Sequence, residues 1–338
     1  MRFGCQLAGL LCAFHATAVA AVTPSVDELL TYLHIDKAER ENLLRGKSLS
    51  TEVAEGAETE LGVGVVMFMP APVEKLVNFV RSGKMFATDH DVIAVGELKE
   101  SAEAADFSGI VFTPEQAKEA ASLLEVGPGM RFNLSGDEIE TFRALKKVVK
   151  DKNMIPAAAA QAYQHLLLQR YRAYRQGGLP AIAPYDRDGG RVSRPGDELL
   201  KALQESLLLA EHFPEIHQII HDYPQQQPND VIHRFFWMNQ KVENRPTFML
   251  THRLSVIRPE GALMAERQFY VGHSYNSLFV LAGCLPMEDG TVVLYSNHTS
   301  TDQVAGFGSA LRHSIGRSQM RDEIVKNFEQ IRRELQSP

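Results

Sequence analysis

The sequence predicts an α+β protein in which an antiparallel sheet is followed by one long C-terminal helix. Between Val231 and Thr299, segments of alternating apolar and polar residues are separated by turn signals such as Pro259-Glu260-Gly261. Beyond Thr301, apolar residues recur mostly three or four apart as far as Leu335, which is the pattern of a helix with one apolar face. A solitary helix of this length buries that face most easily by lying across one face of the sheet.

The strand pattern predicts a meander of five strands. These are Val231–Val242, Phe248–Arg258, Leu263–Gly272, Ser277–Leu285 and Thr291–Thr299. The second strand carries Phe248, Leu250 and Leu254 on one face and polar residues on the other, which is typical of a half-buried strand. The fourth strand is apolar on both faces, so we expect it to be central and covered on both sides.

The long helix is expected to begin irregularly. Gly306, Gly308 and Gly316 weaken helix formation over its first half. The sequence therefore predicts a loose or broken entry and an uninterrupted helix only from about Arg317 onward.

The N-terminal segment has the features of a secretory signal. The apolar run Leu7–Val19 follows Met1-Arg2 and ends in the small residues Ala18-Val19-Ala20. An uncleaved membrane anchor is the alternative, but the run is short for a bilayer span. We expect residues 1–21 to be removed, giving an exported, periplasmic or secreted protein with no transmembrane span in the mature chain.

Composition narrows the class of protein. The chain of 338 residues is 44% hydrophobic and 23% charged, which is ordinary for a globular protein. Its net charge of −7 argues against non-specific nucleic-acid binding. Once the signal is removed, Cys284 is the only cysteine, so we expect no intramolecular disulfide.

The chain divides into four parts after the signal. Residues 22–57 are expected to form a helical arm, with Ser25 and Glu28 as a capping box. Residues 58–112 read as strand Glu58–Met69, a short helix, and strands Val92–Leu98 and Phe107–Phe112. A helical region covers 113–230 and begins at Thr113-Pro114, and the meander with the final helix covers 231–338.

Two blocks of this pattern resemble the START-like, helix-grip superfamily. Strand Leu61–Met69 with Ala71-Pro72-Val73 is similar to its opening strand and helix, and Asp289 to Ile331 is similar to its last strand and lid helix. The resemblance implies a curved antiparallel sheet that grips the long C-terminal helix, here with residues 113–230 as a helical insertion. It also implies the binding of lipids or other apolar molecules more often than catalysis.

A binding cavity is therefore expected between the sheet and the C-terminal helix. Apolar pockets with a few polar groups receive such ligands well. We expect the sheet and the helix to line it with Phe248, Leu250, Arg267, Phe269, Phe279, Leu281, Ile324 and Phe328. Arg267 is the expected polar group, because alternation places it on the more apolar face of its strand. The partner would be an apolar small molecule or lipid; a filled core that binds nothing is the alternative.

Catalytic and metal signatures are weak. His217 and His221 have the spacing of a zinc helix, but the first histidine is not followed by glutamate. Nucleophile elbow, phosphate loop and dinucleotide fingerprint are absent from the sequence. We expect no metal, no cofactor and no catalytic residue, and a packed rather than reactive Cys284. A structural or partner-binding role, or a hydrolase or isomerase with an unrecognised site, remains an alternative to ligand binding.

Overall fold

A computed structural model describes residues 24–84, 86, 89–225, 227–306 and 308–336 of the chain. The expected signal segment, residues 1–21, lies outside the described residues. Within them, no helix is both long enough and apolar enough to cross a membrane.

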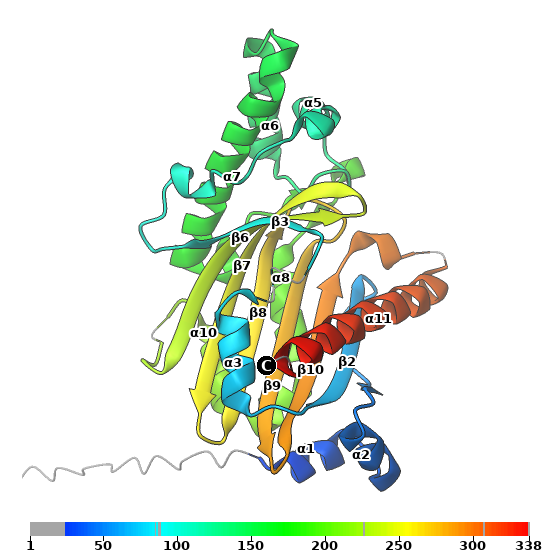
Figure 1. Cartoon of the computed structure of the whole chain (residues 1–338). Coiled ribbons are helices and arrows are strands. Elements are labelled where there is room, and N and C mark those ends of the chain that lie inside the picture. Colours follow the sequence, from blue (N-terminus) through cyan, green and yellow to red (C-terminus); the bar gives the residue numbers. More distant parts are fainter. Residues whose placement is uncertain (1–23, 85, 87–88, 226, 307, 337–338) are drawn as a thin grey trace, which may run out of the picture.

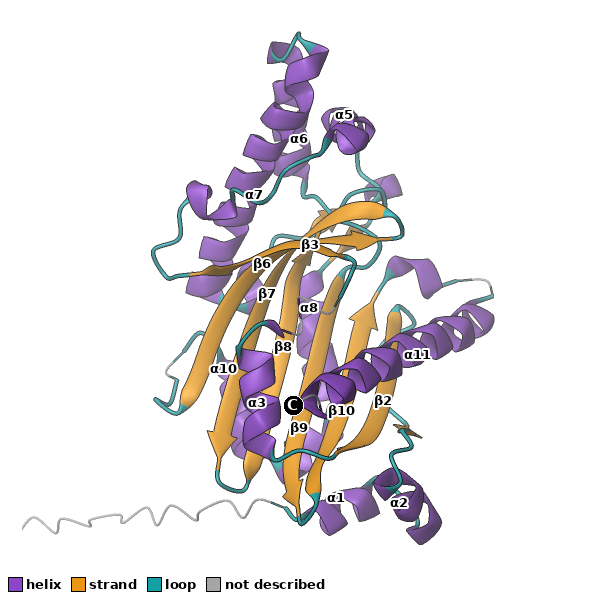
Figure 2. Cartoon of the chain, in the orientation of Figure 1, coloured by secondary structure: helices purple, strands orange, loops and turns teal. Residues whose placement is uncertain are grey.

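The described structure is built on one large antiparallel sheet (Figure 1). Its eight strands are β1 (Leu49–Thr51), β2 (Glu60–Met69), β3 (Val92–Leu98), β6 (Val231–Val242), β7 (Arg245–Arg258), β8 (Gly261–Val271), β9 (Ser277–Met287) and β10 (Gly290–Ser300). Their order across the sheet is β1-β2-β10-β9-β8-β7-β6-β3. The predicted meander of β6 to β10 is therefore confirmed, and the sheet is curved (Figure 2).

The sheet pairs segments that are far apart in the sequence. β2 pairs with β10 along its whole length, from Glu60 with Ser300 to Met69 with Thr291. β3 pairs with β6, although more than 130 residues separate Leu98 from its partner Phe235. The chain thus leaves the sheet after β3, forms the helical region, and returns to the sheet at the neighbouring strand β6.

We call the two sheet faces A and B. Face B carries Val65, Met67 and Val293 and is covered by α3 (Val73–Arg81) and α11 (Ser309–Gln336). Figure 1 shows α11 crossing obliquely over β10 and β2. The predicted packing of the long C-terminal helix on one face of the sheet is confirmed.

Face A carries Phe248, Leu250 and Phe279 and is covered by the remaining helices. These are α5 (Ala117–Leu124), α6 (Gly136–Val148), α7 (Ile155–Gly177), α8 (Pro195–Gln204), α9 (Leu207–His212) and α10 (Pro214–Asp222), with the small hairpin β4 (Tyr185–Asp186) and β5 (Val192–Ser193). The N-terminal helices α1 (Val26–Tyr32) and α2 (Lys37–Leu44) cover the β2 and β10 end of this face. Both faces of the sheet are therefore buried, and the larger core lies on face A.

Two details differ from the sequence prediction. Phe107–Phe112 is not a strand: residues Ala104–Phe107 form a 3-10 helix and the chain then runs without regular structure, with Phe107 and Ile110 buried in the core of face A. The long helix also begins earlier than predicted, at Ser309. The helix includes Gly316, where its backbone packs closely on the sheet: a Cβ at this position would come within 2.9 Å of Leu61 on β2. Close packing on the sheet overrides the poor helix propensity of glycine.

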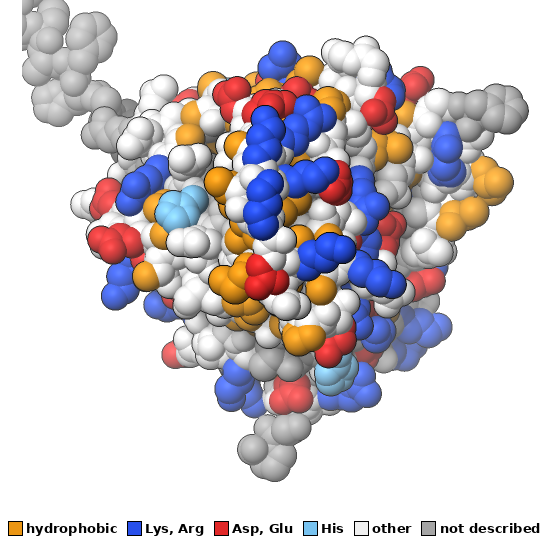
Figure 3. Space-filling view, turned by 90° about the horizontal axis from the view of Figure 1, so that it is seen from above, with side chains coloured by type: hydrophobic (Ala, Val, Ile, Leu, Met, Phe, Trp, Pro, Cys, Tyr) orange, Lys and Arg blue, Asp and Glu red, His pale blue; other side chains and the backbone are white. Residues whose placement is uncertain are grey.

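Charged side chains are unevenly spread. Seen from above, basic side chains gather near the end of the molecule formed by α6 and α7, with acidic ones among them (Figure 3). Lys146, Lys147, Lys150 and Lys152 are exposed in this part of the chain. This end lies far from α1 and α2, which are at the opposite end of the sheet (Figure 1).

Candidate functional site

The candidate site is an apolar pocket on face A, at the seam between two parts of the core. One part packs β7, β8 and β9 against α8, α9 and α10, and the other packs β2 and β10 against α1 and α2. The pocket between them has a volume of about 240 Å³. It is lined from the helices by Leu33, Leu207, Leu208, Leu209, Phe213 and Ile216, and from the sheet by Val256, Leu263, Leu281, Leu285 and Leu294.

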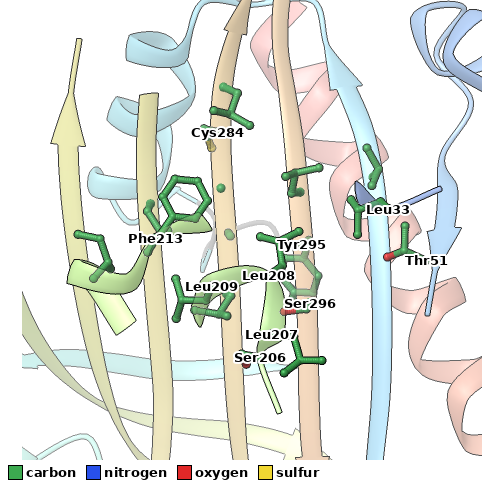
Figure 4. A pocket seen from close by; sticks show the side chains of 18 of the residues that line it. Leu33, Thr51, Ser206, Leu207, Leu208, Leu209, Phe213, Cys284, Tyr295 and Ser296 are labelled. Carbon is green, nitrogen blue, oxygen red and sulfur yellow. The ribbon is translucent and has the colours of Figure 1, made fainter. Parts of the chain in front are cut away.

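Side chains from distant segments meet around the pocket. Figure 4 shows Leu209 and Phe213 on one side and Leu33 and Thr51 on the other, with Leu208 between them. The helical layer breaks here because α8 ends at Gln204 and α9 starts only at Leu207. Leu208 and Leu209, which follow this break, lie over the sheet and line the pocket.

A missing side chain on the sheet makes room for the pocket. Leu281 and Leu285 of β9 project from face A, and alternation places residue 283 between them on the same face. That residue is Gly283. A Cβ added to it would meet only Leu294 Cβ, 4.0 Å away.

Two further glycines bring the wall of the pocket close to the sheet. The segment Thr51–Ala54 lines the pocket, and its first residue, Thr51, pairs with Gly64 of β2. A Cβ at Gly64 would come within 2.2 Å of Thr51, and one at Gly62 would come within 3.0 Å of Val53. The absence of side chains at these positions lets the segment lie directly on the strand.

Polar groups occur at a few places in this apolar surface. Ser296 and His298 of β10 line it, as do Ser206 and the charged residues Glu52, Glu205, Arg258 and Glu260. His298 is buried, and its Nδ1 lies 2.5 Å from Oε1 of the equally buried Glu60. Glu60 Oε2 also accepts a hydrogen bond from the backbone N–H of Gly56, at 2.8 Å.

The structure does not bring the predicted cavity residues together. Phe248, Leu250, Phe269 and Phe279 belong to the core of face A. Ile324 and Phe328 pack on face B against β2 and β10. The expectation that these faces meet is wrong, because the alternation of a strand identifies residues that share a face but not the helix that covers it. Of the eight expected residues, Leu281 alone lines the pocket described here.

A β-bulge explains a second difference. Strict alternation would place Phe269 and Tyr270 on opposite faces, but both lie in the core of face A. The register between β7 and β8 shifts between Leu250 and Thr251, which inserts one extra residue into β8. Beyond this shift, Val271 packs on the opposite side with Met249.

Arg267 is fully buried, but in the core rather than in the pocket. Its Nη2 donates to the carbonyl of Ile220 at 2.7 Å, near the C-terminus of α10. A cation at this position complements the partial negative charge of a helix end. Within the described residues, its Nε and Nη1 groups have no hydrogen-bond partner. Arg267 therefore contacts a helix end and does not line the cavity, as the sequence had predicted it would.

The structure also places the other groups that the sequence singled out, the histidine pair His217/His221 and Cys284. No group of three or more His, Cys, Asp or Glu residues in the described chain is placed to hold a metal ion. His221 is exposed beside Asp222, with its Nδ1 3.0 Å from Oδ1. Burial raises the pKa of the Cys284 thiol to about 12, so the thiol stays protonated.

The sequence signals for the pocket were present but faint. Gly283 interrupts the apolar alternation of its strand, and His298 sits among apolar and hydroxyl residues in a predicted strand. Neither Glu60 nor the segment Leu207–Leu209 could be linked to them, because their contacts depend on the pairing of β2 with β10 and on the break between α8 and α9.

Fold and pocket together define an α+β protein with a two-sided antiparallel sheet and an apolar pocket under its helical layer. Comparisons of the chain with protein-family models, with curated proteins and with solved structures find no match.

Proposed function

We propose that the protein binds an apolar small molecule in the pocket on face A. The observation that carries this proposal is the pocket itself, whose walls are mainly Leu, Val, Ile and Phe side chains from both the helices and the sheet. Such pockets with a few polar groups are the usual form of a small-molecule site. The proposal keeps the ligand class expected from the sequence and moves the site to the other face of the sheet.

The volume limits the size of the ligand. A cavity of about 150 Å³ lined by Leu, Ile and Phe binds benzene. By this comparison, a cavity of about 240 Å³ holds a molecule of roughly ten non-hydrogen atoms. A small aromatic or monoterpene-sized molecule fits this limit better than a whole lipid.

Two further points of the proposal rest on the sequence. The resemblance to helix-grip proteins is supported by α11 lying across the curved sheet and by the pairing of β3 with β6, which encloses the helical region as an insertion. Export of the mature protein is supported by the apolar run Leu7–Val19 and the small residues after it.

Filling the pocket from the sheet tests the proposal. Gly283→Val places two methyl groups where a Cβ meets only ordinary contacts, and valine suits a strand better than glycine. We expect the variant to be at least as stable as the wild type and to bind toluene at least tenfold more weakly, measured by isothermal titration calorimetry. The control is Val95→Ile, which adds bulk on the edge strand β3, away from the residues that line the pocket, and should leave toluene binding unchanged.

The two variants separate pocket binding from general effects. Equal toluene affinity in the wild type and Gly283→Val, or no toluene binding by the wild type, would contradict the proposed function. Strong destabilisation by Gly283→Val would show that the space is smaller than the structure gives.

A further inference from the structure

One polar side chain of the pocket, His298, has a ring nitrogen that a purely apolar ligand would leave without a hydrogen bond. His298 is the last pocket-lining residue along β10, and it is only 2% exposed. Its Nδ1 is engaged by Glu60, whereas its Nε2 makes no hydrogen bond with any described residue. Nε2 is also absent from the fully enclosed polar atoms that lack a partner, so it keeps some accessible surface.

The Glu60 contact fixes which nitrogen is available. In the tautomer that has its proton on Nδ1, the ring donates that proton to the Glu60 carboxylate. A carboxylate on one ring nitrogen fixes both the tautomer and the orientation of the imidazole. Nε2 is therefore an acceptor when the ring is neutral and a donor when it is protonated.

A hydroxyl group matches Nε2 in both states, because it can donate to the neutral ring and accept from the protonated one. A carboxylate ligand would bring a second negative charge close to Glu60 in an apolar, poorly screened space. Within the described residues, Glu60 has no lysine or arginine partner that would offset this repulsion. A pure hydrocarbon would leave Nε2 unpaired.

We propose that the natural ligand is a small apolar alcohol or phenol whose hydroxyl group hydrogen-bonds Nε2 of His298, with Glu60 as the positioning residue for the ring. This inference rests on the proposed function, since it concerns the same pocket. It adds a selectivity: an uncharged hydroxyl compound is preferred over its carboxylate analogue. Sites built to hydrogen-bond a hydroxyl discriminate strongly through the groups left unpaired by other ligands.

Three para-substituted toluenes test this selectivity. They are p-xylene, p-cresol and p-toluate, which differ only in carrying a methyl, a hydroxyl or a carboxylate group. By calorimetry at pH 7, we expect wild-type protein to bind p-cresol at least as tightly as p-xylene and at least tenfold more tightly than p-toluate.

The variant His298→Asn isolates Nε2. Its amide nitrogen occupies roughly the place of Nδ1 and can still donate to Glu60, while nothing replaces Nε2. We expect p-cresol to bind about tenfold more weakly to this variant, the effect of leaving a buried hydroxyl unpaired, and p-xylene to bind as before. Loss of both probes, or of neither, would overturn the inference.

A measurement on the wild type avoids any folding defect of the variant. The ¹⁵N resonance of His298 Nε2 should shift when p-cresol is added and stay in place with p-xylene. No shift with bound p-cresol would overturn the role of His298. If p-xylene binds in a Gly283-dependent way but p-cresol binds no more tightly than p-toluate, the proposed function stands and this inference fails; if no probe binds, the proposed function itself fails.

Discussion

Glu138→Ala is expected to lower the free energy of unfolding by about 3–5 kcal/mol, the usual result of leaving one member of a buried ion pair without its partner. Glu138 Oε1 and Oε2 accept from Nε and Nη2 of Arg170, at 2.7 and 2.6 Å. Arg170 is only 6% exposed and lies between the rings of Tyr185 and Tyr270. Among the described residues, its other hydrogen bond runs from Nη1 to the carbonyl of Ala183, at 3.0 Å. Without Glu138, the guanidinium charge would stay buried and unpaired.

A nearby surface pair provides the control. Glu140 is two residues further along α6 and contacts Arg143 Nη1 at 2.7 Å, with both side chains well exposed. Glu140→Ala should change stability by less than about 0.5 kcal/mol. Urea denaturation of both variants compares the two sites. Equal effects would show that Arg170 finds another partner or water when Glu138 is removed.

Lowering the pH from 7 to 5 is expected to destabilise the folded protein through His252 and His273, and His273 accounts for about 2 kcal/mol of this loss. Burial lowers the pKa of His252 well below its usual value, with His233 and Arg267 adding to the effect. Burial, followed by the nearby charge of Arg245, lowers the pKa of His273 to about 3. Both side chains are enclosed in the fold.

The sign follows from proton binding. In the unfolded chain both histidines take up a proton below about pH 6.5, whereas the folded protein keeps them neutral until a much lower pH. The unfolded state therefore binds more protons as the pH falls, and each histidine costs about 1.4 kcal/mol per pH unit below pH 6.5. Glu198 acts in the opposite direction, because burial raises its pKa.

Urea denaturation at pH 7, 6 and 5 measures this loss. The variant His273→Gln removes one of the two titrating groups, so its stability should fall by about 2 kcal/mol less than that of the wild type over the same range. An equal loss of stability in the wild type and in His273→Gln would mean that His273 takes up a proton as readily inside the fold as in the unfolded chain.

Much of the fold follows from local sequence pattern. The strands from Val231 to Thr299 were predictable because period-two alternation and turn residues both mark them. The capping box at Ser25 likewise marks a true helix start. Phe107–Phe112 was misassigned because a short apolar run buried under helices resembles a strand.

The site depended on information that local pattern does not contain. Which face of the sheet α11 covers is a tertiary property, so Ile324 was assigned to the wrong partners. The bulge beside Leu250 changed the face of Tyr270 without a glycine or proline to signal it. Glu60 and His298 are 238 positions apart and meet only because the first long strand pairs with the last.

The most direct test of the ligand pocket is to locate a bound apolar probe in a crystal of the protein. Crystals soaked in bromobenzene would reveal the bromine by its anomalous scattering. We predict a peak on face A, between Leu209, Phe213 and Leu281, that disappears in crystals of Gly283→Val. A peak on face B, between α11 and the sheet near Ile324 and Phe328, would contradict this account.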